Sequence, residues 1–207
     1  MVFDIFAQSK TEVGLSAGPS FYFGDINTTR SYMNPSFDAG LIYKYNLTKR
    51  YVLRANINYI NLEASDAQSI DQYELYRQAS FNTYLIEAAL LFEFNFLNFK
   101  FSDRYLCFSP YINTGLVSFY CPNTSVQPAI PFSVGVKQTI SNRICFGVEW
   151  CGRMTFTDKL DNLPVSGDGN IKTYLNNNDW YATLTLTLTV RIFSDVNDCP
   201  TYKDCRK

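Results

Sequence analysis

The chain has 207 residues, a length typical of a single domain. Its formal net charge of −1 indicates neither a nucleic-acid partner nor adsorption to a charged membrane surface. Aromatic residues make up 16% of the chain, which favours β-strands and membrane interfaces. No apolar run approaches the ~20 residues of a membrane-spanning helix, because the longest one, 85–96, contains Glu87, Glu93 and Asn95. The composition therefore excludes a helical membrane protein.

The first ten residues are expected to lie outside the folded domain. The stretch MVFDIFAQSK is too short for a complete signal peptide and lacks a basic region. Its IFAQ sequence is similar to the end of a signal peptide cleaved after Ala7. We interpret residues 1–10 as a signal-peptide remnant or as a disordered N-terminus.

Eight segments follow in which apolar and polar residues alternate, the pattern of half-buried strands. They lie near 11–24, 35–47, 50–63, 78–97, 103–119, 129–140, 143–156 and 179–193. Most are longer than the ~9–11 residues with which a tilted strand crosses a bilayer. The sequence therefore predicts an all-β fold, an eight-stranded antiparallel up-and-down β-barrel over residues 11–193.

The eighth segment has the most regular alternation. One face carries Ala182, Leu184, Leu186, Leu188, Val190 and Ile192, and the other carries Thr183, Thr185, Thr187, Thr189 and Arg191. Such alternation fits a soluble barrel with its apolar rows inside, and equally a membrane barrel with these rows facing lipid. The fifth segment gives no clear facing.

The spacing of the segments favours the membrane barrel. Long connections at 25–34, 64–77 and 157–178 alternate with tight turns at 47–50 and 141–143 and a moderate connection at 97–103. Outer-membrane barrels have long external loops and short periplasmic turns. The connection between the fifth and sixth segments is shorter than this scheme prefers. An even number of strands places both termini on the periplasmic side, so the polar residues 194–207 are expected to form a short periplasmic C-terminal tail.

The aromatic residues form two bands, as bilayer interfaces select. Tyr43, Tyr45, Tyr51, Phe94 and Phe96 lie on apolar rows near the short turns, whereas Phe21, Phe23 and Trp180 lie near the long connections. A soluble barrel has no physical reason for such bands. We therefore expect a transmembrane barrel with the apolar rows in lipid.

Four acidic and four basic residues fall on the polar rows, which would face the lumen. They are Asp38, Glu87, Glu93 and Glu149, and Lys44, Arg54, Lys137 and Arg153. Side chains just fill an eight-stranded barrel, and an unpaired buried charge is costly. We expect a salt-bridged lumen; a proton or ion path is the alternative, and a general pore is not expected.

No catalytic, cofactor or metal site is expected. The chain contains no histidine, so the usual base of small outer-membrane hydrolases is missing. Glu87 and Glu93 are ~20 Å apart along one strand at ~3.3 Å per residue, too far to act on one bond. The acidic residues of 157–178 lack the EF-hand spacing. The chain is expected not to be an enzyme.

Six cysteines suit an oxidising compartment, but their spacing does not determine their pairing. Cys107, Cys145 and Cys151 share the polar rows, and Cys121 is expected in a loop. Two others, Cys199 and Cys205, lie in the C-terminal tail. We expect them to form a disulfide either with each other or with a periplasmic partner, and a pairing in the lumen is open to Cys107, Cys145 and Cys151.

Several stretches, in the same order along the chain, resemble a known family. They are YFGDIN (22–27), YKYNLTKRYVLRA (43–55), FEFNF (92–96), FSPY (108–111), PFSVGVKQTIS (131–141), EWCGRMTFTDKLDN (149–162) and NNDWY (177–181). The sequence is similar to the PorG-like outer-membrane barrels of the type IX secretion system of the Bacteroidota. The most specific piece is RMTFTDKLDN.

This resemblance implies a non-catalytic role in protein secretion and gliding motility, in which the barrel anchors a periplasmic ring of PorK-like lipoprotein and PorN-like subunits to the outer membrane. The family is associated with a cysteine bond to PorK, which we assign to Cys199 or Cys205 from the expected side of the tail. The alternative function is that of a stand-alone surface adhesion or binding barrel acting through its external loops.

Overall fold

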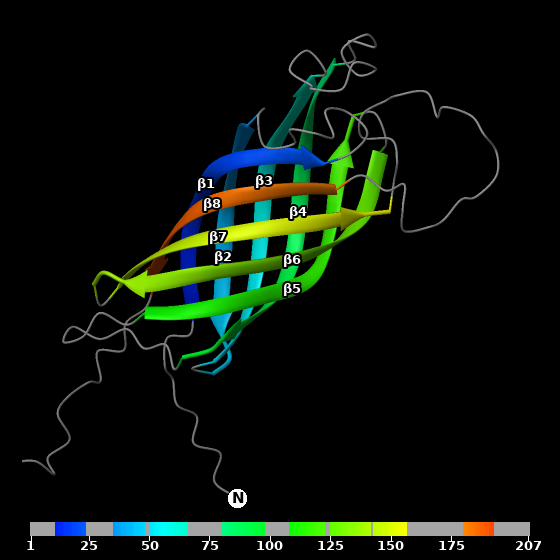
Figure 1. Cartoon of the computed structure of the whole chain (residues 1–207). Coiled ribbons are helices and arrows are strands. Elements are labelled where there is room, and N and C mark those ends of the chain that lie inside the picture. The colour runs from blue at the N-terminus through cyan, green and yellow to red at the C-terminus, as the bar shows by residue number, and fades with distance from the viewer. Residues whose placement is uncertain are drawn as a thin grey trace, which may run out of the picture.

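A computed structural model describes residues 11–23, 35–48, 50–65, 80–97, 108–122, 125–141, 143–156 and 180–192. Within these ranges eight strands form one closed barrel, in which each strand pairs antiparallel with the next and β8 pairs with β1 (Figure 1). The strands are β1 (Thr11–Phe23), β2 (Ser36–Asn46), β3 (Tyr51–Ser65), β4 (Ser80–Asn95), β5 (Phe108–Cys121), β6 (Ser125–Thr139), β7 (Ile144–Thr155) and β8 (Trp180–Arg191). The predicted fold class is confirmed.

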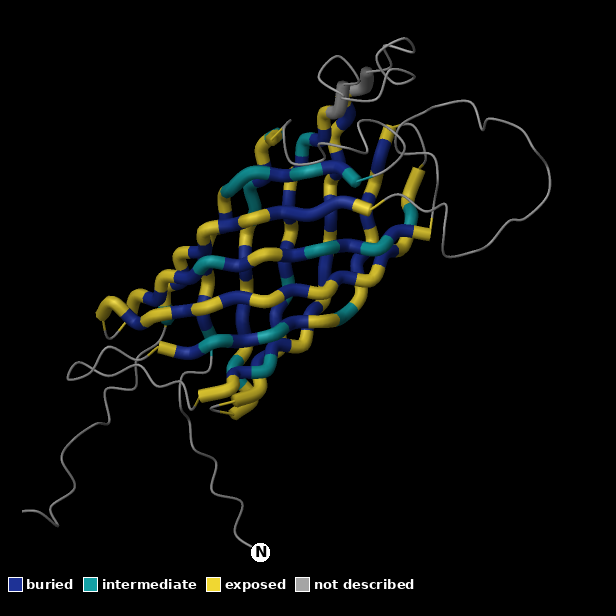
Figure 2. Tube along the Cα trace, viewed as in Figure 1, coloured by how far each residue is buried: buried dark blue, intermediate teal, exposed yellow. Residues whose placement is uncertain are grey.

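Every strand alternates between buried and exposed residues (Figure 2). In β8, Thr183, Thr185, Thr187 and Thr189 are buried, whereas Leu184, Leu186 and Leu188 are exposed. Because successive side chains of a strand point to opposite faces of the sheet, the threonine row lines the interior and the leucine row covers the outside. This arrangement is the reverse of a water-soluble barrel.

The predicted bounds of the fifth and sixth strands were wrong. The described part of β5 runs from Phe108 to Cys121, so Cys121 ends a strand instead of lying in a loop. The sixth strand begins at Ser125, before the predicted residue 129. Pro128 and Pro131 conceal this strand in the sequence, since proline lacks the N–H of a ladder hydrogen bond and usually marks an edge or a break.

The two ends of the barrel differ in their connections. At one end, hereafter the turn end, β1 begins, β8 ends, and the strands are joined by 47–50, 96–107 and 140–143. The opposite end, hereafter the loop end, carries the connections 24–35, 66–79, 122–124 and 156–179. The connection 122–124 is tight, so the alternation of long and short connections is incomplete. The predicted connection 97–103 lies almost wholly outside the described residues. The predicted segments 1–10 and 194–207 lie outside the described residues.

Aromatic side chains form an outer belt near each end of the barrel. Tyr51 stacks on Phe92 near the turn end, with 5.6 Å between ring centroids. Near the loop end, the Tyr59 and Tyr84 rings stack at 5.9 Å. Tyr51 and Tyr59 are eight residues apart on β3, ~26 Å along the strand at ~3.3 Å per residue. Between the belts the exposed rows are mostly apolar, with Leu53 and Ile57 on the same strand. The surface therefore matches the apolar band of a membrane barrel.

No helix in the described ranges is long and apolar enough to cross a bilayer.

Candidate functional site

The most distinctive chemistry of the molecule lies inside the barrel. All eight charged residues that the sequence assigns to the lumen are buried there, none more than 4% exposed. They are Asp38, Lys44, Arg54, Glu87, Glu93, Lys137, Glu149 and Arg153. The structure groups them around three glutamates at successive depths.

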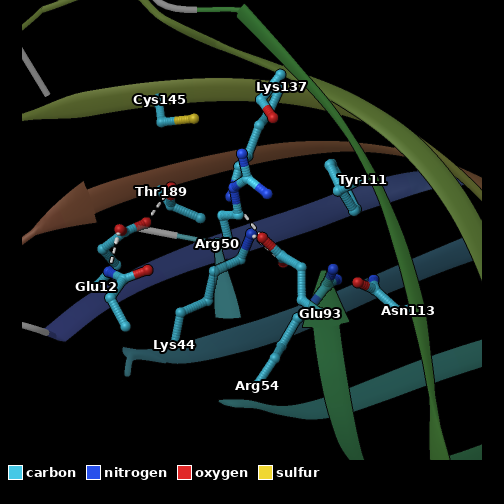
Figure 3. A network of polar contacts seen from close by, with 12 residues as sticks. Glu12, Lys44, Arg50, Arg54, Glu93, Tyr111, Asn113, Lys137, Cys145 and Thr189 are labelled. Atoms are coloured by element: carbon cyan, nitrogen blue, oxygen red, sulfur yellow. Dashed lines mark hydrogen bonds and ion pairs between the residues drawn. The ribbon is translucent and has the colours of Figure 1, made fainter. Parts of the chain in front are cut away.

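Glu93, on β4, is the acid closest to the turn end among these three. Lys137 Nζ lies 2.5 Å from its Oε1, and Lys44 Nζ lies 3.0 Å from its Oε2. Both ammonium groups also lie 5.5 Å from the ring centroid of Tyr111, a cation–π distance. Figure 3 shows these side chains converging from different strands. One carboxylate thus holds two lysines, and the Tyr111 ring attracts both ammonium groups.

Glu149, on β7, forms the second centre. Arg54 Nη1 donates to its Oε2 at 2.5 Å, the hydroxyl of Tyr111 donates at 2.8 Å, and Asn113 Nδ2 donates at 3.3 Å. Arg54 also donates from Nε to Asn56 Oδ1 at 2.9 Å. Buried charges are stable only when they are paired and hydrogen-bonded. The bonds of Glu149 meet this condition and link β3, β5 and β7 across the lumen.

Glu87, on β4, forms the third centre nearer the loop end. Arg153 Nε lies 2.6 Å from its Oε2, the hydroxyl of Tyr181 donates at 2.8 Å, and Asn58 Nδ2 donates to Oε1 at 2.9 Å. The Arg153 guanidinium also lies 5.2 Å from the Tyr181 ring centroid. Tyr181 therefore stabilises both members of this ion pair: its hydroxyl donates to Glu87, and its ring contacts Arg153.

Beyond Glu87, towards the loop end, the interior becomes apolar. Of the buried apolar cluster, Tyr22, Ile60, Leu62, Leu85, Phe119, Cys121, Ala129 and Tyr181 lie at this end. Its other members, Ala89, Leu91 and Val117, lie on the turn-end side of Glu87 and line the polar cavity. Phe119 packs edge-on against Tyr181 with 6.0 Å between centroids. The interior is therefore a charged region at the turn-end side and a hydrophobic core at the loop-end side.

A cavity of about 10 Å³, lined by residues that include Asp38, Arg54, Glu87 and Glu149, lies within this polar region. Its volume is near that of one water. Asp38 Oδ1 has no hydrogen-bond partner in the described part of the chain. The expectation that the predicted charges all pair therefore fails at this oxygen.

Several interior polar residues escaped the sequence reasoning. Glu12 is 3% exposed and accepts hydrogen bonds from Asn46 Nδ2 at 2.6 Å and Thr189 Oγ1 at 3.2 Å. Glu12 has the same parity as Gly14 and Ser16 in β1, opposite to the apolar Val13 and Leu15, and this alternation could have identified it as an interior residue. Tyr111 was missed because the fifth segment gives no clear facing. Tyr181 has the parity of the Thr183 row, and this was the signal that could have found it.

The cysteines of the described ranges carry no disulfide. Cys121, Cys145 and Cys151 are buried free thiols. Cys145 and Cys151 are six residues apart on β7 and face the interior, ~20 Å from each other. The disulfide candidates Cys199 and Cys205, and Cys107, lie outside the described residues. Within the described part, no group of acids and cysteines could hold a metal ion.

The filled interior, together with the apolar outer surface and its aromatic belts, defines the class of the protein. It is a membrane-type eight-stranded β-barrel of the kind found in outer membranes. The chain belongs to the family described as "Domain of unknown function (DUF6089)", whose model matches residues 1–201. No curated protein matches the sequence.

Solved outer-membrane barrels have the same fold. The crystal structure of Neisserial surface protein A (NspA) is similar to 88% of this chain and 97% of that one, with a TM-score of 0.52 and 9% identity. The outer membrane protein OprG from Pseudomonas aeruginosa is similar over 90% of this chain and 98% of that one, with a TM-score of 0.50 and 9% identity. At such identities the likeness concerns the fold.

Proposed function

We propose that this protein is a non-catalytic outer-membrane component of the type IX secretion machinery, which anchors a periplasmic ring of PorK-like and PorN-like subunits. The secretion role is supported by the sequence stretches that resemble PorG-like barrels. The anchoring role is supported by one structural observation above all: the lumen is filled by ion pairs and an apolar core. A barrel with a filled lumen has no channel, so its role is that of a membrane anchor whose two ends are available for contact with partner proteins.

The geometry of the interior also bears on the other function classes. The three glutamates are each bonded to cations or hydroxyl groups within the barrel, and the cavity beside them has a volume of about 10 Å³. Such an arrangement gives a substrate no room to approach an acid or base. This favours a structural role over catalysis or the binding of a small ligand.

In the proposed orientation the turn end faces the periplasm and the loop end faces outside. Two of the three turn-end connections, 47–50 and 140–143, are tight, as is typical of the periplasmic side of such barrels. The ring would contact these turns, the connection 96–107 and the tail 194–207.

Co-purification in mild detergent followed by mass spectrometry tests the proposal. The full chain, tagged at its C-terminus and expressed in its own host, is expected to retain PorK-like and PorN-like proteins. Recovery of the folded barrel without any periplasmic protein would contradict the anchoring role and favour the adhesion alternative. A barrel whose connections 24–35 and 156–179 are shortened serves as a control, since it should retain the ring but lose an adhesin function.

The covalent form of the proposal concerns the tail. Replacing both Cys199 and Cys205 with serine is expected to remove a disulfide-linked heteromer from a non-reducing gel, while Cys121→Ser, a change inside the barrel, leaves it in place. A high-mass band that survives the double replacement contradicts the assignment of the bond to the tail.

A further inference from the structure

The charges that line the barrel are unevenly distributed along its axis. Around the cavity and Glu87, three acids face two bases: Asp38, Glu87 and Glu149 against Arg54 and Arg153. At the turn end, the described inward rows and the residues that flank them carry five bases and two acids: Lys44, Arg50, Lys137, Arg143 and Arg191 against Glu12 and Glu93. The turn end is therefore basic in the part of the chain that the structure describes.

Three of these bases lie at the rim. Arg50 and Arg143 directly precede β3 and β7, and Arg191 ends β8. The backbone N–H of Asn95 donates to the Arg50 carbonyl at 2.8 Å, and the backbone N–H of Arg191 donates to the Arg143 carbonyl at 2.8 Å. These bonds fix the backbone of all three arginines at the mouth of the barrel.

The alternation of the strands directs these arginines to the lumen side. The neighbouring residues Tyr51, Ile144 and Val190 are exposed on the outer rows, so the arginines next to them have the opposite parity. Arg50 accordingly belongs to the polar network around Glu93 in Figure 3. We call Arg50, Arg143 and Arg191, with the interior groups directly below them, the turn-end mouth.

A second, independent feature of the turn-end mouth is a set of buried polar groups without partners. Asn95 is 1% exposed, yet neither its Nδ2 nor its Oδ1 has a hydrogen-bond partner in the described residues. Thr139, 2% exposed, has an unpartnered Oγ1 at the same end of β6. Buried polar groups without partners are unfavourable. Asn95 Nδ2 and the Thr139 hydroxyl are donors that a carboxylate oxygen would complete, whereas Asn95 Oδ1 would need a donor such as a peptide N–H.

We propose that the turn-end mouth binds an acidic peptide segment of a periplasmic partner. Arginine guanidinium groups bind carboxylates through paired hydrogen bonds, and the amide of Asn95 and the hydroxyl of Thr139 add neutral donors below them. The periplasmic location of this partner rests on the proposed function, because that function sets the orientation of the barrel.

A peptide fits this site better than a lipid headgroup does. Headgroups surround the barrel and meet its outer rows, where Tyr45 and Tyr51 form the turn-end belt. The arginines instead have inward parity when the strand alternation is continued into the turns, with Arg50 and Arg143 exposed at the rim and Arg191 half-buried. An extended acidic segment can enter along the barrel axis, whereas a lipid with two acyl chains would have to leave the bilayer.

Binding is measured with a fluorescein-labelled deca-glutamate peptide and the full chain in phosphatidylcholine nanodiscs. Fluorescence anisotropy at about 0.05 M salt is expected to show saturable binding, which weakens at about 0.5 M salt because surface charges are then screened. The variant R50Q/R143Q/R191Q is expected to bind about tenfold or more weakly, as three ion pairs are lost together. Absence of binding by the unmodified protein at low salt overturns the proposal.

A charge-matched variant controls for net charge. Arg30→Gln, Arg77→Gln and Lys172→Gln change three bases in the connections 24–35, 66–79 and 156–179, which join strands at the opposite end. This variant is expected to bind within about twofold of the unmodified protein. An equal loss in both triple variants overturns the site. Single variants, Arg50→Gln and Arg143→Gln, provide the measurement if the triple variant does not fold, with an expected loss of about two- to fivefold each.

Two further measurements are needed. The first distinguishes a peptide from a phosphate as the bound anion, and the second distinguishes failure of the binding site from failure of the proposed function. Inorganic phosphate at the concentration of the peptide carboxylates is expected to leave peptide binding unchanged, and displacement of the peptide by phosphate overturns the proposal in favour of a phosphate ligand. Ring capture is measured separately by co-purification. Peptide binding without ring capture refutes the proposed function alone, whereas ring capture by the barrel without peptide binding refutes the turn-end mouth alone.

Discussion

Glu93 shows at the scale of one residue how the interior is stabilised. Its carboxylate is shared between Lys44 of β2 and Lys137 of β6, which approach it from different walls of the barrel. Such an arrangement is stable only as a whole, because the removal of one partner leaves the other charges buried and uncompensated.

Replacing Glu93 with glutamine is expected to destabilise the barrel by about 3–5 kcal/mol, the usual cost of breaking a buried ion pair. The measurement is urea unfolding in detergent micelles, followed by far-ultraviolet circular dichroism. Glu63→Gln, the same chemical change at an exposed position of β3, is the matched control and is expected to change stability by less than about 0.5 kcal/mol. Equal stabilities of the two variants would show that the lysines do not depend on Glu93.

The identity of the interior charges could be predicted from the sequence, but their partners could not. Asp38, Lys44 and Arg54 fall on polar rows by simple alternation. Which acid meets which base depends on the stagger between distant strands, and that stagger is set when the barrel closes. Tyr111 and Tyr181 could not be assigned either, since a tyrosine fits an outer belt and an inner hydrogen bond equally well.

At the scale of the strand, the outward-facing apolar rows make the barrel stable in a lipid bilayer. Leu186 of β8 lies between Ala17 of β1 and Val148 of β7, far from either end of the strand. Its side chain is 53% exposed on the outer surface. In a membrane this exposure is contact with lipid.

Replacing Leu186 with arginine is expected to cost about 2–4 kcal/mol in a bilayer, since a charge on the lipid face is most costly near the midplane. Val190→Arg, four residues further along the same row and next to the turn end, is expected to cost about 0–1 kcal/mol. Reversible urea unfolding in phospholipid vesicles measures both values. Equal costs at the two positions would contradict the depth that the structure assigns to Leu186.

Close packing between strands predicts a different sensitivity. A Cβ added at Gly115 of β5 would lie 2.0 Å from the carbonyl oxygen of Leu90 in β4, a backbone atom that cannot move alone. Gly115→Ala is therefore expected to destabilise the barrel by about 1–3 kcal/mol, as overpacking does. At Gly152 the nearest atom is in the Trp150 ring at 3.3 Å, so Gly152→Ala is the control and should be nearly neutral. Comparable losses in the two variants would contradict the close approach of β4 and β5.

The strands themselves were predictable to different degrees. Regular alternation in β8 and β4 fixed both their position and their facing. In β6, Pro128 and Pro131 interrupt the pattern, and the predicted start came too late by the length of 125–128. The paired register continues across this region, with Val117 opposite Ala129 and Thr114 opposite Phe132. Pro128 pairs with Ser118 of β5 and Pro131 with Arg153 of β7, so each proline keeps one paired neighbour. Such pairing between strands is invisible in a single sequence.

At the scale of the whole molecule, the barrel separates three environments. Its outer surface is apolar between two aromatic belts, its turn-end interior is charged, and its loop-end interior is a hydrophobic core. The charged interior and the apolar exterior together require lipid outside, because in water the exposed leucine and phenylalanine rows would be unfavourable. The proposed anchoring function depends on this placement of the apolar rows.

The chain contains two tryptophans, which report on this placement directly. Trp150 and Trp180 are both exposed on the outer rows. Trp150 lies opposite Leu184, which is four residues from Trp180 on β8, or ~13 Å along the strand. The two side chains therefore sample different depths of the same surface.

Fluorescence quenching by brominated phospholipids, measured on Trp150→Phe and Trp180→Phe variants in vesicles, tests the central claim most directly. We expect lipid bromines to quench both tryptophans, with deep bromines more effective for Trp150 and shallow bromines more effective for Trp180. Iodide in the aqueous phase should quench both residues much less than it quenches free tryptophan. Tryptophans that are quenched by iodide and unaffected by brominated lipid would contradict the lipid-facing outer surface.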